Sequence, residues 1–246
     1  MKVVVVMPAY NSAKTLRWTY NEIPKKEVDE IILTDDCSKD NTVEIAKELG
    51  IKVFQHKRNR GYGGNQKTCY TEALKASGDI IVMLHPDYQY DPKKMSKLIQ
   101  PLKEGRADVV YGSRMAVKGG AKKGGMPSYK QTGNKLLTWF FNAFLGTRLS
   151  DAATGYIAYS RKALIKIPFK RNSDGYTFDE EAIIQCVALR LRIVEVPIPT
   201  RYLKEMSSIK FWQSVKYGAR IFLMTLLFGL HRLGFRQKRF MASRAR

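Results

Sequence analysis

Two side chains near the start of the sequence could bind the nucleoside part of a ligand. Asp36 follows a short apolar run, and its carboxylate could accept hydrogen bonds from a nucleobase N–H or a ribose hydroxyl. Tyr10 follows an earlier apolar run and could stack on a base. Either residue alone could simply stabilise the turn in which it lies. The motifs around the two residues therefore decide whether they bind a nucleoside.

A second group of side chains could hold a divalent metal. His85, Asp87 and Gln89 follow the apolar run at residues 80–84. Asp87 with Gln89 could bind a cation that bridges a pyrophosphate. His85 could add a nitrogen ligand, which would favour manganese over magnesium. A histidine at the end of a strand is also common without any ligand role, so both interpretations of His85 stay open.

A glycine-rich turn lies between these groups. Gly61 and Gly63 fit the start of the dinucleotide-binding pattern G-x-G-x-x-G, but Gln66 stands at its last position. The turn is therefore not that fingerprint, although nearby cations such as Lys67 could still face phosphates. With the groups above, it indicates a nucleoside-diphosphate site with a metal.

Alternating strands and helices would bring these groups together. The apolar runs predict strands, and the stretches between them predict helices; the expected strands are Val3–Met7, Glu30–Thr34, Lys52–Phe54, Ile80–Leu84 and Asp108–Tyr111, and the expected helices are Ala13–Ile23, Asn41–Leu49, Gly64–Ala76 and Pro92–Glu104. This pattern predicts a mostly parallel sheet with helices on both faces. Ligands of such sheets bind at the carboxyl ends of the strands, where these side chains occur.

The composition and the net charge limit the classes of protein to which the chain could belong. The chain has 246 residues, of which 44% are hydrophobic, and a net charge of +21. Three distant cysteines exclude a disulfide framework or a zinc ribbon and favour a reducing compartment. The positive charge would attract nucleic acid, anionic lipid or phosphorylated substrates. No helix-turn-helix, RNP-like or zinc-finger pattern accompanies it, so we expect no nucleic-acid partner.

Read in order, the motifs resemble family 2 glycosyltransferases of the GT-A fold, and within them the dolichol- and polyprenyl-phosphate sugar synthases. The resemblance extends over about residues 2–210. The motifs that carry it are Pro8-Ala9-Tyr10-Asn11, Asp35-Asp36-x-Ser38-x-Asp40-x-Thr42, Asn59-x-Gly61, the His85–Gln89 motif, Gly112-Ser113-Arg114, Ser150-Asp151-x-x-Thr154-Gly155-Tyr156, Phe178-Asp179-x-Glu181, Glu195-Val196-Pro197-Ile198, Arg201-Tyr202 and Ser207-Ser208-Ile209.

The resemblance implies a GT-A catalytic domain over residues 1–205, a Rossmann-like α/β fold. It also implies roles for individual residues. The donor contacts would be Pro8, Ala9, Tyr10, Asn11, Thr34, Asp36, Gly61, Lys67, Asp87 and Arg114; the ligands of Mn²⁺ or Mg²⁺ would be His85, Asp87 and Gln89; the cations for an acceptor phosphate would be Lys118, Lys122, Lys123, Arg201 and Lys210; and the catalytic group would comprise Asp87, Arg114, Asp179 and Glu181.

Three departures from the family pattern affect these roles. His85 replaces the first acid of the usual D-x-D, which bears on metal preference. Ser12 replaces an acid often found after P-x-Y-N, which bears on base identity. Ser207-Ser208 replaces a Ser-Lys pair, so Lys210 would have to substitute for the lysine. A degenerate, non-catalytic relative is an alternative that follows from His85.

The expected reaction is an inverting transfer of a mannose- or glucose-type sugar from GDP-mannose or UDP-glucose to a polyprenyl or dolichyl phosphate. A lipid phosphate is already an anion and needs cations rather than a base. The run from Val109 to Ser150 has seven cations and no acid, and its segment KGGAKKGG predicts a mobile basic loop over that phosphate. A hydroxyl acceptor is the alternative, and it would need a general base, for which Asp151, Asp179 and Glu181 are candidates.

The last 41 residues predict a membrane-surface segment. Residues 206–246 are basic and aromatic, and residues 209–233 predict an amphipathic helix in the headgroup plane. Packing on its own domain or on a partner subunit is the alternative. Because no stretch reaches about 20 apolar residues, we expect no membrane span. The expected location is cytoplasmic, peripheral at the inner face of the membrane.

Overall fold

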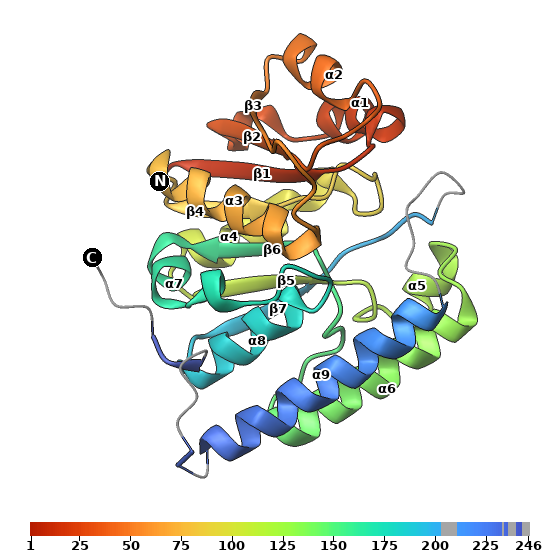
Figure 1. Cartoon of the computed structure of the whole chain (residues 1–246), viewed down its shortest axis with the longest axis vertical. Coiled ribbons are helices and arrows are strands. Elements are labelled where there is room, and N and C mark those ends of the chain that lie inside the picture. Colours follow the sequence, from red (N-terminus) through yellow and green to blue (C-terminus); the bar gives the residue numbers. More distant parts are fainter. Residues whose placement is uncertain (203–210, 233, 236–239, 243–246) are drawn as a thin grey trace.

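The structure, a computed structural model, describes residues 1–202, 211–232, 234–235 and 240–242, with side chains of 211–217 and 232 excepted. Its strands form one sheet in the order β3-β2-β1-β4-β6-β5-β7 (Figure 1). β6 runs antiparallel to β4 and β5, and the other pairs are parallel. The predicted mostly parallel α/β sheet is confirmed. The strands are β1 Val3–Ala9, β2 Glu30–Asp35, β3 Lys52–Gln55, β4 Ile80–Met83, β5 Val109–Ser113, β6 Ile157–Ser160 and β7 Ile193–Pro197.

Strand β1 lies between two hydrophobic cores. All seven of its residues are buried, as a central parallel strand requires. Val3, Val5 and Met7 belong to one core, while Val4 and Val6 belong to the other, because successive side chains point to opposite faces.

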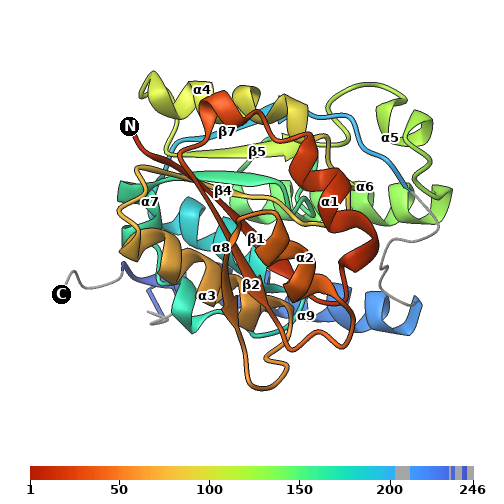
Figure 2. The ribbon, with the colours of Figure 1, turned by 90° about the horizontal axis from the view of Figure 1, so that it is seen from above.

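Helices cover both faces of the sheet (Figure 2). α1, α2 and α4 contribute Leu16, Ala46 and Leu98 to the core on one face, and α3 and α8 contribute Tyr70 and Ile183 to the core on the other. The helices are α1 Ala13–Asn21, α2 Thr42–Glu48, α3 Tyr62–Lys75, α4 Met95–Lys103, α5 Gly120–Lys123, α6 Ser128–Leu145, α7 Arg161–Lys166, α8 Phe178–Ala188 and α9 Phe211–Arg232, with short 3-10 turns η1 Lys25–Glu27, η2 Pro92–Lys94 and η3 Phe169–Arg171.

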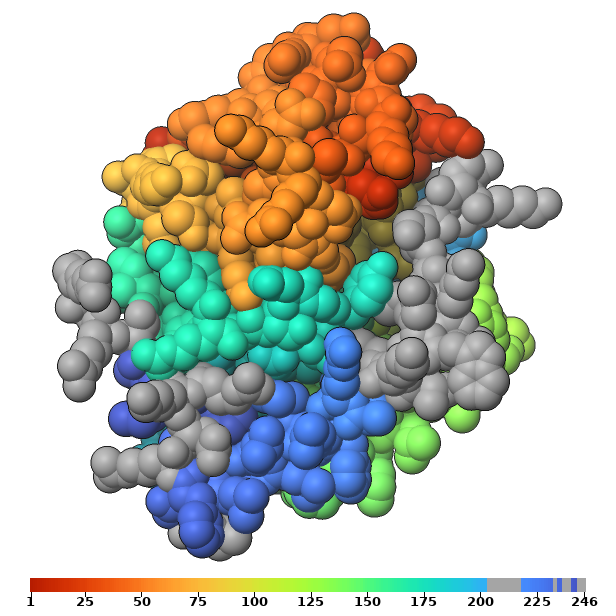
Figure 3. Space-filling view, viewed as in Figure 1, coloured from red at the N-terminus to blue at the C-terminus, as the bar shows by residue number. Residues whose placement is uncertain are grey.

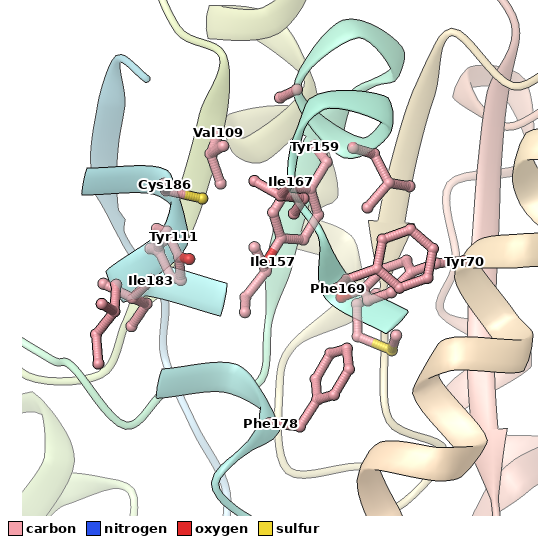
Figure 4. Packing of buried hydrophobic residues seen from close by; sticks show 14 of the residues in the cluster. Tyr70, Val109, Tyr111, Ile157, Tyr159, Ile167, Phe169, Phe178, Ile183 and Cys186 are labelled. Atoms are coloured by element: carbon pink, nitrogen blue, oxygen red, sulfur yellow. The ribbon is translucent and has the colours of Figure 1, made fainter. Parts of the chain in front are cut away.

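Aromatic contacts fix α3 and α8 against the sheet (Figure 4). The ring of Tyr70 meets Tyr159 of β6 edge-on, with centroids 5.4 Å apart, and lies 6.0 Å from Phe178 at the start of α8. These buried rings set the position of the residue after Phe178, Asp179.

The acid-free run is more ordered than the sequence predicted. The expected basic loop is partly helical, because α5 covers Gly120–Lys123 of the segment KGGAKKGG, and the 18-residue helix α6 follows it. α9 lies beside α6 along one edge of the molecule (Figure 1), within the range predicted for the tail helix. Its side chains Ile221, Met224 and Phe228 join the core that contains Phe141 of α6. In the described part of the chain, no helix has the length and hydropathy to cross a membrane.

Candidate active site

The candidate site lies where the strand order reverses, between β1 and β4. β2 is the neighbour on the other side of β1, so the loops after β1, β2 and β4 end at one edge of the sheet. Thr15 Oγ1 donates to the carbonyl of Pro86 at 2.6 Å, which ties the start of α1 to the loop after β4. Open α/β sheets bind their ligands at such a reversal.

Hydrogen bonds lock the loops after β1 and β2 together. The amide of Asn11 donates to Ser38 Oγ at 2.8 Å, and the amide of Lys39 donates to Asn11 Oδ1 at 2.8 Å. Asn11 and Cys37 both have positive φ, at 50° and 66°, and such strain often accompanies functional loops. Of the predicted donor contacts here, Pro8 and Ala9 are buried within β1, whereas Tyr10 is 49% exposed and available to a base.

Asp36 organises the turn that follows β3. Its carboxylate accepts the amides of Arg60 and Gly61 at 2.8 and 2.9 Å, and Oδ1 lies 2.7 Å from His56 Nδ1. The carboxylate predicted to contact the base or the ribose is thus bonded to backbone amides. Thr34, another predicted contact, is fully buried. Sequence reasoning passed over Asp35, whose buried Oδ1 has no hydrogen-bond partner in the described structure.

The glycine-rich turn packs against residues 173–175. The amide of Gly63 donates to the carbonyl of Asp174 at 2.8 Å, and a Cβ on Gly63 would lie 2.2 Å from the carbonyl oxygen of Ser173. Lys67 Nζ donates to Asp174 Oδ1 at 2.7 Å. The glycines and Lys67 therefore hold this segment, and close backbone approach accounts for Gly63 without any phosphate.

The loop after β4 presents Asp87 next to Tyr88, whose side chain is held by Glu22. Tyr88 adopts a positive φ of 62°, and its hydroxyl donates to Glu22 at 2.6 Å. Arg201 lies over the Tyr88 ring at 4.3 Å and donates to Glu22 Oε2 at 3.0 Å. Arg201, predicted to meet the acceptor phosphate, is thus paired with an acid. Asp87 is half-buried, and its Oδ1 accepts the amide of Gln89 at 3.0 Å.

Tyr62 links His85 to Asp179, a connection that the sequence did not suggest. Its hydroxyl donates to Asp179 Oδ2 at 2.7 Å and lies 3.1 Å from His85 Nε2, while the two rings stack. Because the single hydroxyl hydrogen goes to Asp179, the Tyr62 oxygen accepts from His85 Nε2, and in the neutral imidazole Nδ1 then carries the lone pair. Gly155 permits this arrangement, since a Cβ there would lie 2.9 Å from His85 Nε2.

Asp179 and Glu181, the candidate bases at the start of α8, are both buried. Burial raises the pKa of Asp179 despite the hydrogen bonds from Tyr62 and Gln66, and its Oδ1 has no partner within the described residues. Glu181 accepts the amide of Ser173 at 3.0 Å and the hydroxyl of Thr177 at 3.1 Å. Asp179 therefore joins α8 to Tyr62 and Gln66 of α3, whereas Glu181 holds the loop that precedes α8.

Arg114 and Asp151 form a buried ion pair. Arg114 Nε and Nη2 donate to the two carboxylate oxygens at 2.7 and 2.8 Å, and Asn134 adds a third hydrogen bond to Asp151 at 2.8 Å. Burial alone would raise the pKa of Asp151, but the charge of Arg114 and the hydrogen bonds from Arg114 and Asn134 together outweigh burial and lower that pKa. Arg114, expected at the donor phosphates, is 8% exposed, and Asp151 is fully buried.

The predicted acceptor cations on α5 lie beside the segment that carries Arg201. The amide of Tyr202 donates to the carbonyl of Gly124 at 2.9 Å, and a Cβ on Gly124 would lie 2.2 Å from the carbonyl oxygen of Thr200. Lys122 and Lys123 on α5, and Lys118 two residues before it, are all exposed. Lys210 lies outside the described residues.

Comparison with known sequences relates the chain to glycosyltransferases. A family model described as "Glycosyl transferase family 2" matches residues 4–168. The chain is 35% identical over 201 residues to an uncharacterized protein of Methanocaldococcus jannaschii, covering 82% of each chain. It is 30% identical to the UDP-N-acetylglucosamine–dolichyl-phosphate N-acetylglucosaminyltransferase of Methanococcus voltae, covering 92% of this chain and 95% of that one. The undecaprenyl-phosphate mannosyltransferase of Micrococcus luteus is 28% identical, with 80% and 83% covered.

Solved structures share the fold. Glucosyl-3-phosphoglycerate synthase from Mycobacterium tuberculosis, in complex with Mn²⁺, UDP and phosphoglyceric acid, aligns with a TM-score of 0.72 over 93% of this chain and 78% of that one. The two sequences are 20% identical in this alignment, so the similarity concerns the fold alone.

Proposed function

Because the chain belongs to glycosyl transferase family 2, we propose that it moves a sugar from a nucleoside-diphosphate donor to a polyprenyl or dolichyl phosphate. The observation that carries the proposal is the edge of the sheet at the β1–β4 reversal. There the exposed Tyr10 and the half-buried Asp87 follow neighbouring strands, beside the loop after β2. An aromatic ring and a carboxylate in this arrangement suit the base and the metal-bound pyrophosphate of one donor.

The side chains at the end of β4 fit a divalent metal whose coordination the donor completes. No group of three His, Cys, Asp or Glu residues gathers anywhere in the described ranges, so protein side chains there could supply only part of a ligand set. Mg²⁺ is commonly held by one or two carboxylates together with phosphate oxygens and waters, and Mn²⁺ takes similar ligands. Asp87 and Gln89 would hold the metal, joined by His85 through Nδ1. When bound, it would neutralise charge on the departing pyrophosphate.

The buried carboxylates favour a lipid-phosphate acceptor over a hydroxyl acceptor. Asp151 is paired with Arg114, Glu181 accepts hydrogen bonds from Ser173 and Thr177, and Asp179 accepts one from Tyr62. A general base must reach the proton that it removes, and none of these three is more than 5% exposed. An acceptor phosphate is already ionised and needs no such base. The exposed lysines of α5 would bind it.

The names of the relatives broaden the set of donors to test. One acts with UDP-N-acetylglucosamine and dolichyl phosphate, and another is an undecaprenyl-phosphate mannosyltransferase. The donor of this chain would accordingly be GDP-mannose, UDP-glucose or UDP-N-acetylglucosamine. The reaction would take place at the cytoplasmic face of the membrane, with the basic segment 206–246 close to the lipid.

A lipid-extraction assay tests the proposal. Purified protein is incubated with Mn²⁺, a short-chain polyprenyl phosphate in detergent and each radiolabelled sugar nucleotide in turn. We expect label in the organic phase with one donor, and a loss of at least about 100-fold in Asp87→Ala. Glu48→Gln, on the exposed side of α2, is the control and should transfer normally.

Donor binding without label in the organic phase would contradict the lipid acceptor and favour the hydroxyl alternative. In that case the base would be sought among Asp151, Asp179 and Glu181. Equal transfer by Asp87→Ala would contradict the proposed metal site.

A further inference from the structure

Helix α6 buries Phe141 and Leu145 but exposes further large apolar side chains on its outer face. Its buried face includes two polar residues, Asn134 and Thr138, which serve Asp151 and the amide of Ala152 through hydrogen bonds. On the opposite face, Tyr129, Leu136 and Trp139 are 62%, 64% and 67% exposed. A surface helix normally places its apolar stripe toward the core, so this outer stripe is not accounted for by folding of the domain.

Helix α9 repeats this arrangement next to α6. Ile221, Met224 and Phe228 face the core, whereas its outer face is apolar as well. The exposed large hydrophobic residues on that outer face are Phe222, Leu223, Leu226 and Leu230. Figure 3 shows α9, in blue, at the surface of the lower part of the molecule.

The two outer faces form one surface. The rings of Phe140 on α6 and Phe222 on α9 stack with centroids 4.9 Å apart, so the stripes meet along the seam between the helices. We call this surface the α6–α9 face; it comprises Tyr129, Leu136, Trp139, Phe140, Phe144, Phe222, Leu223, Leu226 and Leu230. Contiguous apolar surfaces of this kind mark interaction sites.

The charges on the two helices identify the partner. Neither helix contains an acid, and together they carry Lys130, Lys135, Lys216, Arg220 and Arg232. Lys135 and Arg220 are exposed. Two copies of such a face would bring cation against cation, whereas an anionic bilayer offers both an apolar interior and the complementary charge.

We propose that the α6–α9 face lies in the headgroup layer of an anionic membrane, with α6 contributing as much as α9. Neither helix crosses the bilayer in this arrangement, which agrees with the hydropathy of the described helices. α5, with Lys122 and Lys123, immediately precedes α6 in the chain, so the face carries the predicted acceptor cations to the lipid surface. The inference deepens the proposed function and rests on it only for the acceptor's identity.

Vesicle co-sedimentation of the full chain tests the face directly. The vesicles are phosphatidylcholine with or without phosphatidylglycerol, and they contain no polyprenyl phosphate. We expect binding to the anionic vesicles, reduced about tenfold or more by Leu136→Glu or Trp139→Glu on α6 and by Leu226→Glu on α9. Ile165→Glu, at an exposed position on α7, is the matched control and should leave binding unchanged.

Three results would overturn the inference. The first is failure of the wild-type chain to bind anionic vesicles. The second is undiminished binding by both α6 variants, which would assign the membrane contact to other residues. The third is a stable dimer in sedimentation velocity that Trp139→Glu dissociates, with no vesicle binding, which would make the face a contact between copies.

The lipid-extraction assay in detergent separates this inference from the proposed function. Because the substituted side chains are exposed on the outer faces of α6 and α9, the variants should still transfer sugar to the short-chain acceptor. Lost vesicle binding with retained transfer therefore supports the docking face. Vesicle binding without transfer by the wild-type chain would leave the face standing and contradict only the proposed reaction.

Discussion

Asp151 is the residue on which the interior of the candidate site depends most. Its carboxylate neutralises Arg114 in a place without solvent, and removing one partner of such a pair leaves an uncompensated buried charge. We expect Asp151→Asn to lower the free energy of unfolding by about 3–5 kcal/mol. Urea denaturation at neutral pH measures it. The exposed pair Arg17–Glu48 supplies the control, since Glu48→Gln should cost at most about 1 kcal/mol.

The same substitution has a predictable pH dependence. The folded-state pKa of Asp151 is lowered, so its stabilisation is present above its unfolded pKa of about 3.9 and is lost as the pH falls through the folded value. The difference in unfolding free energy between wild type and Asp151→Asn should therefore be constant near neutrality and shrink in acid, below about pH 4. A difference that persisted in acid would mean that the asparagine acts by altered packing rather than by lost charge.

Tyr62 should act on metal binding through His85. Tyr62→Phe removes the acceptor for His85 Nε2 and the donor to Asp179 without changing the ring stack. Because partners that orient a metal ligand commonly contribute 10- to 100-fold in affinity, we expect about a tenfold weaker apparent affinity for Mn²⁺ with a nucleoside diphosphate. Calorimetric titration measures it. Tyr176→Phe removes the hydroxyl of the other ring beside Tyr62 and should have no such effect; an equal loss in both variants would refute the link.

At the level of elements, two glycines in helices should respond in opposite ways to alanine. Gly63 lies at the start of α3, where a Cβ would meet Ser173 and Phe178 at 2.2 and 2.9 Å. Gly133 lies within α6, where a Cβ would meet nothing within 4 Å. Gly63→Ala should destabilise by about 1–3 kcal/mol through overpacking, and Gly133→Ala should stabilise by about 0.5–1 kcal/mol. Urea denaturation of both variants makes the comparison, and equal effects would contradict the close packing of α3 on residues 173–175.

The alternating first half of the fold was predictable from the sequence, whereas in the second half the tail helix α9 was predicted but strands β6 and β7 and helix α6 were not. β1 to β5 and α1 to α4 follow the predicted ranges closely, because parallel buried strands are apolar runs bounded by turn residues. β6 and β7 gave no comparable signal. No helix was predicted at α6, because its outward apolar residues and its inward Asn134 and Thr138 weaken the usual amphipathic pattern.

The convergence of the loops was predictable from the sequence, but the contacts of their side chains were not. The loops after β1, β2 and β4 do meet, as parallel topology requires. Arg114, Arg201 and Lys67 were predicted to face phosphates, yet each is paired with an acid that is distant in sequence. A lone sequence does not reveal which of its 43 cations a folded chain neutralises internally, nor that Tyr62 would bridge His85 and Asp179.

For the whole molecule, internal pairing leaves the net charge of +21 to act at the surface. Lys118, Lys122 and Lys123 are exposed near the segment that carries Arg201, so they would gather an anionic acceptor rather than stabilise the fold. Replacing all three by Gln should raise the KM for polyprenyl phosphate about tenfold and leave the donor KM unchanged. Added salt should have the same effect on the wild type, because exposed charges are screened beyond about 10 Å at 0.1 M ionic strength.

A charge-matched variant decides whether the position of the lysines or the total charge of the protein determines the affinity for the acceptor. Lys47, Lys97 and Lys103 are equally exposed but lie on α2 and α4, so their replacement by Gln removes the same charge elsewhere. Steady-state transfer rates over a range of acceptor concentrations should separate the two triple variants. If both triple variants raised the acceptor KM equally, the acceptor would be attracted by the net positive charge of the whole protein. Lys118, Lys122 and Lys123 would then have no specific part in binding its phosphate. A rise confined to the α5 variant would place the acceptor phosphate beside α5, next to the face that we assign to the membrane.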